Sequence, residues 1–198
     1  MSQSDRASFA QAYVERLAKV LAALPFENLA RAMEVLERAA DEGRTLFIAG
    51  NGGSAATASH MANDFLKGAQ AGGGPGLRAI SLADGTALLT AVANDLSYEQ
   101  VFAEPLRVLA RRGDVLLLIS GSGNSPNVVR AAAVASELGL VSVAFLGKGG
   151  GLVRDMVDVE VTVPSDDYGP IEDAHMCLDH LITAWLVKRG STGSARRG

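Results

Sequence analysis

Residues 45–60 read TLFIAGNGGSAATASH, in which an apolar run, a turn of small residues and a helical pattern follow one another directly. The run at 45–49 is typical of a buried strand, and a helix is expected from about residue 55. Glycines in such a turn let the backbone approach a ligand, and the N–H groups that open the helix favour an anion. A tight turn also uses glycine for steric reasons, so both alternatives stay open for this loop alone. Ligands of open α/β sheets do bind where it lies, beyond the carboxyl end of a strand.

A second stretch repeats this construction. Residues 116–129 read LLLISGSGNSPNVV, so Ser120, Ser122 and Ser125 supply three hydroxyls just before a helix that begins near Pro126. The alternative for Ser125 is a plain helix N-cap. Because two such loops follow two strands of one sheet, we expect them to bind the phosphate of a sugar phosphate together. Neither loop continues into Gly-Lys-Ser/Thr, and the acidic residue of a dinucleotide fingerprint is missing, so a nucleotide is disfavoured.

Outward from these loops, short apolar runs alternate with helical patterns. This alternation predicts a three-layer α/β/α sandwich around a five-stranded parallel sheet, because strands without polar alternates are covered on both faces. The expected strands are 45–49, 77–82, 115–119, 141–146 and 157–163. The expected helices are 55–68, 84–94, 98–111, 126–138 and 170–189.

Two further helices are expected at about 5–42, separated by Pro25, because apolar residues recur there at three- and four-residue spacings. We expect part of their apolar surface to pair with a second copy of the chain, since a five-stranded sheet needs less cover than they offer. The sequence thus predicts one domain over 1–189, these helices included, and a disordered tail at 190–198.

Composition narrows the function classes. The 198 residues carry a net charge of −4 with mixed signs and no basic stripe, which disfavours nucleic acid as a partner. No apolar run approaches the roughly 18 residues of a membrane span, and the start lacks a signal-peptide pattern. The single cysteine, Cys177, has no CxxC companion and lies in an apolar pattern, so we expect a small core residue and a cytoplasmic protein.

The two loops, together with ANDLSYEQVF at 93–102 and PIEDAHMCLDH at 170–180, resemble the sugar isomerase (SIS) domain family. The resemblance extends to about Lys188. Within the family it is closest to the phosphoheptose isomerases, and the histidine pair His60 and His180 indicates this subgroup. It implies conversion of sedoheptulose 7-phosphate into D-glycero-D-manno-heptose 7-phosphate by a homotetramer with active sites between subunits. The alternatives are an isomerase of another sugar phosphate and a non-catalytic regulatory or adaptor protein, which can lose these histidines.

The resemblance also implies the site residues. Phosphate and sugar contacts are expected from Asn51, Gly52, Gly53, Ser54, Asn94, Asp95, Ser120, Gly121, Ser122 and Ser125. One zinc or other divalent ion per active site is expected at His60, Asp64, Glu172 and His180. For proton transfer we assign Asp64 as the base, Glu172 as its substitute and His180 as the partner acid/base. Two ligands depart from the family pattern, because Asp64 stands for a glutamate and Glu172 for a glutamine.

Helical geometry separates the four metal candidates. His60 and Asp64 are four residues apart and share a helix face, so they can bind one ion, although a surface hydrogen bond is the common alternative. Glu172 and His180 are eight residues apart, about 12 Å along a continuous helix. We therefore expect Glu172 to precede the helix or to come from a different subunit. His175 is expected to support the site or an interface without binding directly.

Overall fold

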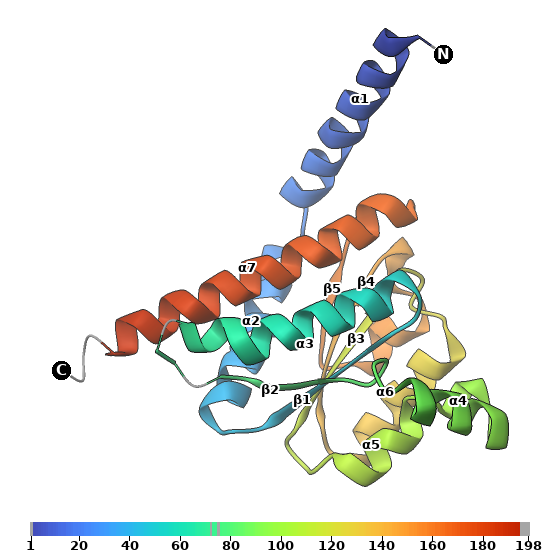
Figure 1. Cartoon of the computed structure of the whole chain (residues 1–198), viewed down its shortest axis with the longest axis vertical. Coiled ribbons are helices and arrows are strands. Elements are labelled where there is room, and N and C mark those ends of the chain that lie inside the picture. The colour runs from blue at the N-terminus through green and yellow to red at the C-terminus, as the bar shows by residue number, and fades with distance from the viewer. Residues whose placement is uncertain (1, 72, 75, 195–198) are drawn as a thin grey trace.

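Five parallel strands form the middle layer of the computed structural model, which describes residues 2–71, 73–74 and 76–194 (Figure 1). Their order in the sheet is β2-β1-β3-β4-β5, which confirms the predicted fold class. The strands are β1 (Thr45–Gly50), β2 (Arg78–Ser81), β3 (Val115–Ser120), β4 (Val141–Leu146) and β5 (Val159–Thr162). The chain leaves β1 toward β2 on one side and returns to β3 on the other, with Gly50 paired to Ile119. The loops after β1 and β3 therefore flank the point where the strand order reverses, which is the usual ligand crevice of open α/β sheets.

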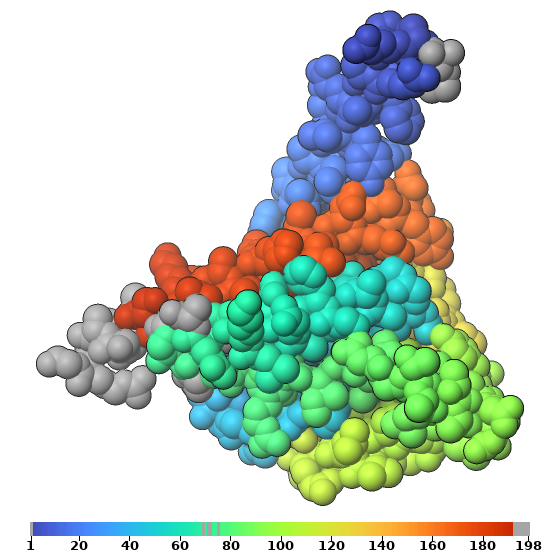
Figure 2. All heavy atoms as spheres, in the orientation of Figure 1, coloured from blue at the N-terminus to red at the C-terminus, as the bar shows by residue number. Residues whose placement is uncertain are grey.

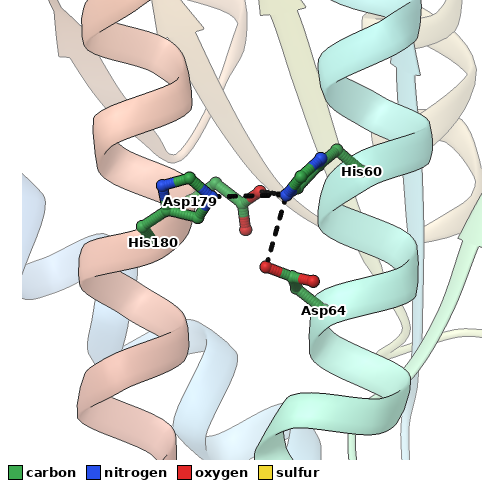
Figure 3. Close-up of side chains that lie close together, drawn as sticks. All are labelled: His60, Asp64, Asp179 and His180. Atoms are coloured by element: carbon green, nitrogen blue, oxygen red, sulfur yellow. Dashed lines mark hydrogen bonds and ion pairs between the residues drawn. The ribbon is translucent and has the colours of Figure 1, made fainter.

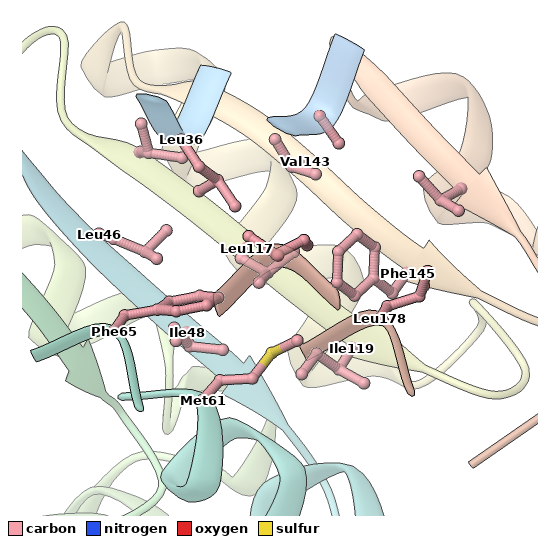
Figure 4. Close-up of a cluster of buried hydrophobic side chains, with 14 of the residues drawn as sticks. Leu36, Leu46, Ile48, Met61, Phe65, Leu117, Ile119, Val143, Phe145 and Leu178 are labelled. Carbon is pink, nitrogen blue, oxygen red and sulfur yellow. The ribbon is translucent and has the colours of Figure 1, made fainter. Parts of the chain in front are cut away.

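Helices cover both faces of this sheet because its strands are apolar on both sides. One face packs α2 (Phe26–Asp41), α3 (Gly53–Ala71) and α7 (Tyr168–Ser194) over Leu46 and Ile48 of β1 (Figure 4). The other face, which includes Phe47 and Ala49, packs against the remaining helices. These are α4 (Thr86–Asp95), α5 (Ala103–Leu109) and α6 (Pro126–Leu138), with the 3₁₀ turns η1 (Tyr98–Gln100), η2 (Lys148–Gly150) and η3 (Leu152–Met156). Both predicted core faces are thus filled.

Helix α1 (Gln3–Ala22) projects away from these layers, as Figures 1 and 2 show. None of its described residues is buried, and the side chains of Phe9 and Val14 are 71% and 64% exposed. Its C-terminal end joins the body through Val20 and Leu21, which pack against the core, and Tyr13 donates a 2.5 Å hydrogen bond to Asp173 on α7. The two predicted N-terminal helices are confirmed, and only α2 covers the sheet.

Three predictions are corrected. The helix expected at 98–111 is split into η1 and α5, because Pro105 lacks an N–H group and is tolerated only in the first turn of an α-helix. Helix α7 continues to Ser194, so the tail predicted from residue 190 is helical to that point, and 195–198 lie outside the described residues. Cys177 is exposed and is not a core residue, because it falls on the outer face of α7. Among the described residues, no helix combines the length and the apolarity that crossing a bilayer requires.

Candidate functional site

A pocket of about 160 Å³ lies beyond the carboxyl ends of β1 and β3, between the two Gly/Ser loops and the start of α7. Its lining comprises Asn51, Ser54, Ile119, Ser120, Gly121, Ser122, Ser125, Tyr168 and Glu172. Six of the ten residues predicted to contact substrate are in this set. Gly52 and Gly53 belong to the same loop without lining the pocket, and Asn94 and Asp95 lie at the exposed end of α4, outside the lining. The structure therefore brings the two predicted loops together in one chain.

The first loop is held rigidly by its asparagine. Asn51 and Asn127 exchange two amide hydrogen bonds of 2.9 and 2.8 Å, and Tyr98 donates a third, of 3.0 Å, to the Asn51 side-chain oxygen. At the start of α3, a Cβ on Gly53 would lie 2.6 Å from Oε2 of Glu172, so the Glu172 carboxylate packs directly against this glycine. The start of α3 thus lies against the Glu172 side chain of α7 at the pocket.

The second loop bends back on itself through its own serines. The Ser120 hydroxyl accepts the N–H of Gly123 at 3.1 Å, and Ser122 accepts the N–H of Asn124 at 3.3 Å. Gly123 has φ of +61°, and a Cβ there would lie 1.8 Å from the Gly150 carbonyl oxygen. Ser125 occupies the N-cap position of α6, yet its side chain makes no capping hydrogen bond. The N-cap alternative for Ser125 is therefore not supported, and its hydroxyl is available to the pocket.

Helix α7 supplies the wall that the loop pattern did not reveal. Tyr168 begins the helix, and Nζ of Lys148 lies 3.7 Å from the centroid of its ring. Glu172, one turn further, is the one charged residue among those that line the pocket. An anion would thus be bound by hydroxyls and N–H groups beside a carboxylate. The missed residue was Tyr168, whose position directly before the helical pattern was the available signal.

A second group of side chains lies between α3 and α7 (Figure 3). His60 and Asp64 come from α3, and Asp179 and His180 come from α7. One ligand atom from each lies within 4.8 Å of the others. Nε2 of His60 is 3.3 Å from Nε2 of His180, 3.5 Å from Oδ2 of Asp64 and 3.8 Å from Oδ2 of Asp179. Two imidazoles and two carboxylates are a donor set that suits zinc and other divalent ions.

The structure separates one predicted metal ligand from this group and adds another. Glu172 is inside α7, not before it, and is absent from the group of four. Asp179, which the sequence pattern did not single out, is fully buried, and its Oδ2 has no hydrogen-bond partner among the described residues. Burial raises the pKa of the Asp179 carboxyl to about 6, and Asp64 adds to this while His60 and His180 oppose it. Its place beside His180 was the signal available in the sequence.

His175 lies in the core, which corrects its prediction as a site-supporting or interface residue. Its side chain is 1% exposed, and its Nε2 is 3.2 Å from the carbonyl oxygen of Leu146 on β4. Burial lowers its pKa from 6.5 to about 4, and the Leu146 contact opposes the shift. The ring is therefore neutral near pH 7 and packs beside Phe145.

Helices α3 and α7 connect the pocket to the group of four, because they run side by side in the same direction. Gly53 faces Glu172 at one end, His60 faces His180 in the middle, and a Cβ on Gly68 would lie 2.9 Å from Thr183. Six residues separate Ser54 from His60, which is about 9 Å along α3. The pocket and the group of four thus lie along the same pair of helices.

Comparisons with known proteins agree with this arrangement. A model of the SIS domain family matches residues 8–147. The phosphoheptose isomerase of Geotalea daltonii is 41% identical over 162 residues, which is 82% of this chain and 84% of that protein. That of Geobacter sulfurreducens is 40% identical and covers 86% and 92%. The solved structure of phosphoheptose isomerase from Neisseria gonorrhoeae superposes with a TM-score of 0.85 at 31% identity, over 93% of this chain and 98% of that one.

Proposed function

The chain belongs to the SIS domain family, and from that premise we propose that it is a phosphoheptose isomerase. It interconverts sedoheptulose 7-phosphate and D-glycero-D-manno-heptose 7-phosphate, an aldose-ketose isomerisation. One observation carries the assignment to this site: a hydroxyl-lined pocket and a two-histidine group lie along the same pair of helices. The pocket suits the phosphate end of the substrate and the histidines suit its carbonyl end.

Phosphate binding falls to the two loops. They offer four hydroxyls to the pocket, from Ser54, Ser120, Ser122 and Ser125. Binding energy gained at the phosphate is remote from the reacting carbons, so it positions them against the catalytic side chains. In the proposal the loop after β1 also contacts the sugar, at Asn51, Gly52 and Gly53. In this proposal the substrate that Asn94 and Asp95 contact is the one bound in another subunit's site.

Isomerisation moves one proton between C1 and C2 through an enediol and others between the two oxygens. We assign Asp64 as the base for the carbon proton and His180 as the acid/base for the oxygens, because they lie on opposite helices of the group (Figure 3). Glu172 stands at the pocket wall of its own chain. It replaces Asp64 as a base only where a neighbouring subunit brings it close.

The divalent ion of the family fits His60, Asp64 and His180. A bound zinc would polarise the substrate carbonyl and stabilise the oxyanion of the enediol. The Oδ2 of Asp179 is buried beside His60 without a hydrogen-bond partner among the described residues, and a cation at this position would satisfy it. One carboxylate oxygen of Asp64 would then bind the ion with His60 and His180, and the other oxygen would remain to exchange a proton.

A homotetramer remains part of the proposal. Helix α1 has no buried residue in its own chain and exposes Phe9 and Val14, so its apolar side chains need another surface. Sedimentation of the full chain against a variant with Phe9→Ser and Val14→Ser tests this. A smaller assembly of the variant is expected, and an unchanged assembly contradicts α1 as the contact. A cytoplasmic location also stays a prediction.

The activity is tested by incubating the purified protein with sedoheptulose 7-phosphate and zinc, manganese or nickel, and measuring the heptose product. Shorter ketose phosphates and hexosamine phosphates, run in parallel, separate the heptose reaction from that of another sugar phosphate. The His180→Gln variant is the matched control, because it keeps the pocket. Turnover of no ketose phosphate would leave a regulatory or adaptor role.

A further inference from the structure

We propose that Asp179 is a metal ligand, which completes a site of His60, Asp64, Asp179 and His180 within a single chain. The inference rests on the proposed metal-dependent function but names a residue that the family resemblance does not supply. It also gives the metal a complete set of four side chains without Glu172.

The placement of Asp179 is the first argument. Its side chain is fully buried and directed toward His60, as Figure 3 shows. The distance from its Oδ2 to Nε2 of His60 is 3.8 Å, which is too long for a hydrogen bond. Two donor atoms that are each about 2 Å from one tetrahedral ion lie roughly 3.3 Å apart, so a shift of about half an ångström would bring Oδ2 into coordination range. The same group places His180 and Asp64 around that point.

The bonding of Asp179 is the second argument. Its Oδ1 accepts a 3.5 Å contact from the Thr183 hydroxyl, whereas Oδ2 has no hydrogen-bond partner among the described residues and has only the 3.8 Å approach of His60. A carboxylate oxygen removed from water without a partner costs several kcal/mol, so buried carboxylates are usually paired or bound to metal. The unpaired atom is the one that faces the histidines. A cation there would satisfy it.

The position of Glu172 is the third argument. In the same helix it is eight residues before His180, about 12 Å away along the axis. Its carboxylate instead lies against Gly53 at the pocket. Within one chain the fourth ligand is therefore Asp179. Glu172 can bind the ion only if an assembly brings it from another subunit. A single-chain site and a composite site thus predict opposite effects of substituting Asp179 and Glu172 on metal affinity.

The test compares Asp179→Asn with Glu172→Gln, each an isosteric loss of one carboxylate charge. The affinity of the purified proteins for zinc is measured by competition with a chromophoric chelator, at one pH and without substrate. We expect at least a 10-fold weaker affinity for Asp179→Asn, the size of effect that removing a metal-site partner has. Glu172→Gln should stay within about twofold of the starting protein, because an exposed carboxylate this far from the ion adds little. The reverse ranking would overturn the proposal and favour the composite site.

A second variant tests contact with the metal directly. Asp179→Cys in a Cys177→Ser background places a thiol at the ligand position, and Co²⁺ should then give a sulfur-to-cobalt charge-transfer band. The Cys177→Ser background alone is the control and should give none. Absence of the band in a folded Asp179→Cys protein that still binds Co²⁺ overturns the proposal. Both readouts are independent of turnover, so a protein that binds zinc as expected but isomerises nothing refutes the proposed function alone.

Discussion

Nε2 of His60 and Nε2 of His180 lie 3.3 Å apart although 120 residues separate them in the chain. Two facing imidazole nitrogens need one proton or one cation between them, because two protonated rings would repel. The contact joins α3 to α7 at the middle of their shared interface. Apolar packing between the two helices fixes this contact, since Met61 of α3 and Leu178 of α7 belong to the same buried cluster.

Asp64→Asn should lower kcat for sedoheptulose 7-phosphate by about 10²- to 10⁴-fold, the usual contribution of a positioned acid/base. The KM should change little, since the phosphate pocket is at the other end of the helices. Steady-state kinetics measure both. The control adds Asn63→Asp to Asp64→Asn, which moves the carboxylate to the neighbouring exposed position. This double variant should not recover the rate. A kcat within tenfold of the starting protein would remove Asp64 as the base.

Ser125→Ala should raise the KM for a sugar phosphate by about 10-fold or more, because a hydrogen bond to a charged group contributes about 1.5–3 kcal/mol. Its thermal stability should be unchanged, since the Ser125 side chain makes no capping hydrogen bond. Ser136→Ala, near the exposed end of the same helix, is the matched control for both measurements. A loss of stability with an unchanged KM would return Ser125 to the role of a cap.

Glu172→Gln should bind inorganic phosphate about 3- to 10-fold more tightly in a competition assay, because it removes the charged carboxylate that lines the pocket. The size corresponds to a repulsion on the order of 1 kcal/mol between separated charges in a solvated site. The gain should shrink at high salt, where screening weakens the repulsion. Asp173→Asn, next along α7 but bonded to Tyr13, is the control. Weaker phosphate binding by Glu172→Gln would show that the carboxyl group assists binding.

His175 should make the protein less stable as the pH falls from about 6.5 to about 4. Over this range the unfolded state takes up a proton that the buried ring refuses, because burial lowers the native pKa to about 4. The loss approaches about 3 kcal/mol at the lower end. Asp179 has the opposite effect on stability as the pH falls, since its raised pKa lets the native state bind a proton at a higher pH than the unfolded state does.

Denaturant unfolding of the starting protein and of His175→Gln, repeated across this pH range, isolates the histidine. The contribution of Asp179 is common to both proteins and cancels in the difference. The unfolding free energy of the starting protein minus that of His175→Gln should decrease toward low pH. Parallel curves for the two proteins would contradict the prediction.

The sequence was sufficient for the sheet and the loops because both depend on local patterns. Apolar runs such as 115–119 identify strands. The serines that follow β3 line the pocket because they come directly after the end of this strand. The break at Pro105 and the length of α7 were missed because element ends depend on packing more than on propensity. Cys177 was assigned to the core by its apolar neighbours, and the rotation of α7 put it outside.

The site was predicted in part for a related reason. His60, Asp64 and His180 share a helix face or a motif, and the structure brings them together. Asp179 follows from the rotation of α7 against α3, which no spacing within one helix determines. The separation of Glu172 from His180 did follow from helical rise alone. Contacts between elements were thus the part that the sequence left undetermined.

Helix α7 follows every strand in the chain, and this order has a consequence for synthesis. The sheet can pair completely before Tyr168 leaves the ribosome, but α2 and α3 cover its face over Ile48 only in part until α7 docks. The same docking event closes the core, builds one wall of the pocket and brings His180 to His60. A nascent or truncated chain without α7 is therefore both incompletely folded and without a site, so ligand binding reports that the last element is in place.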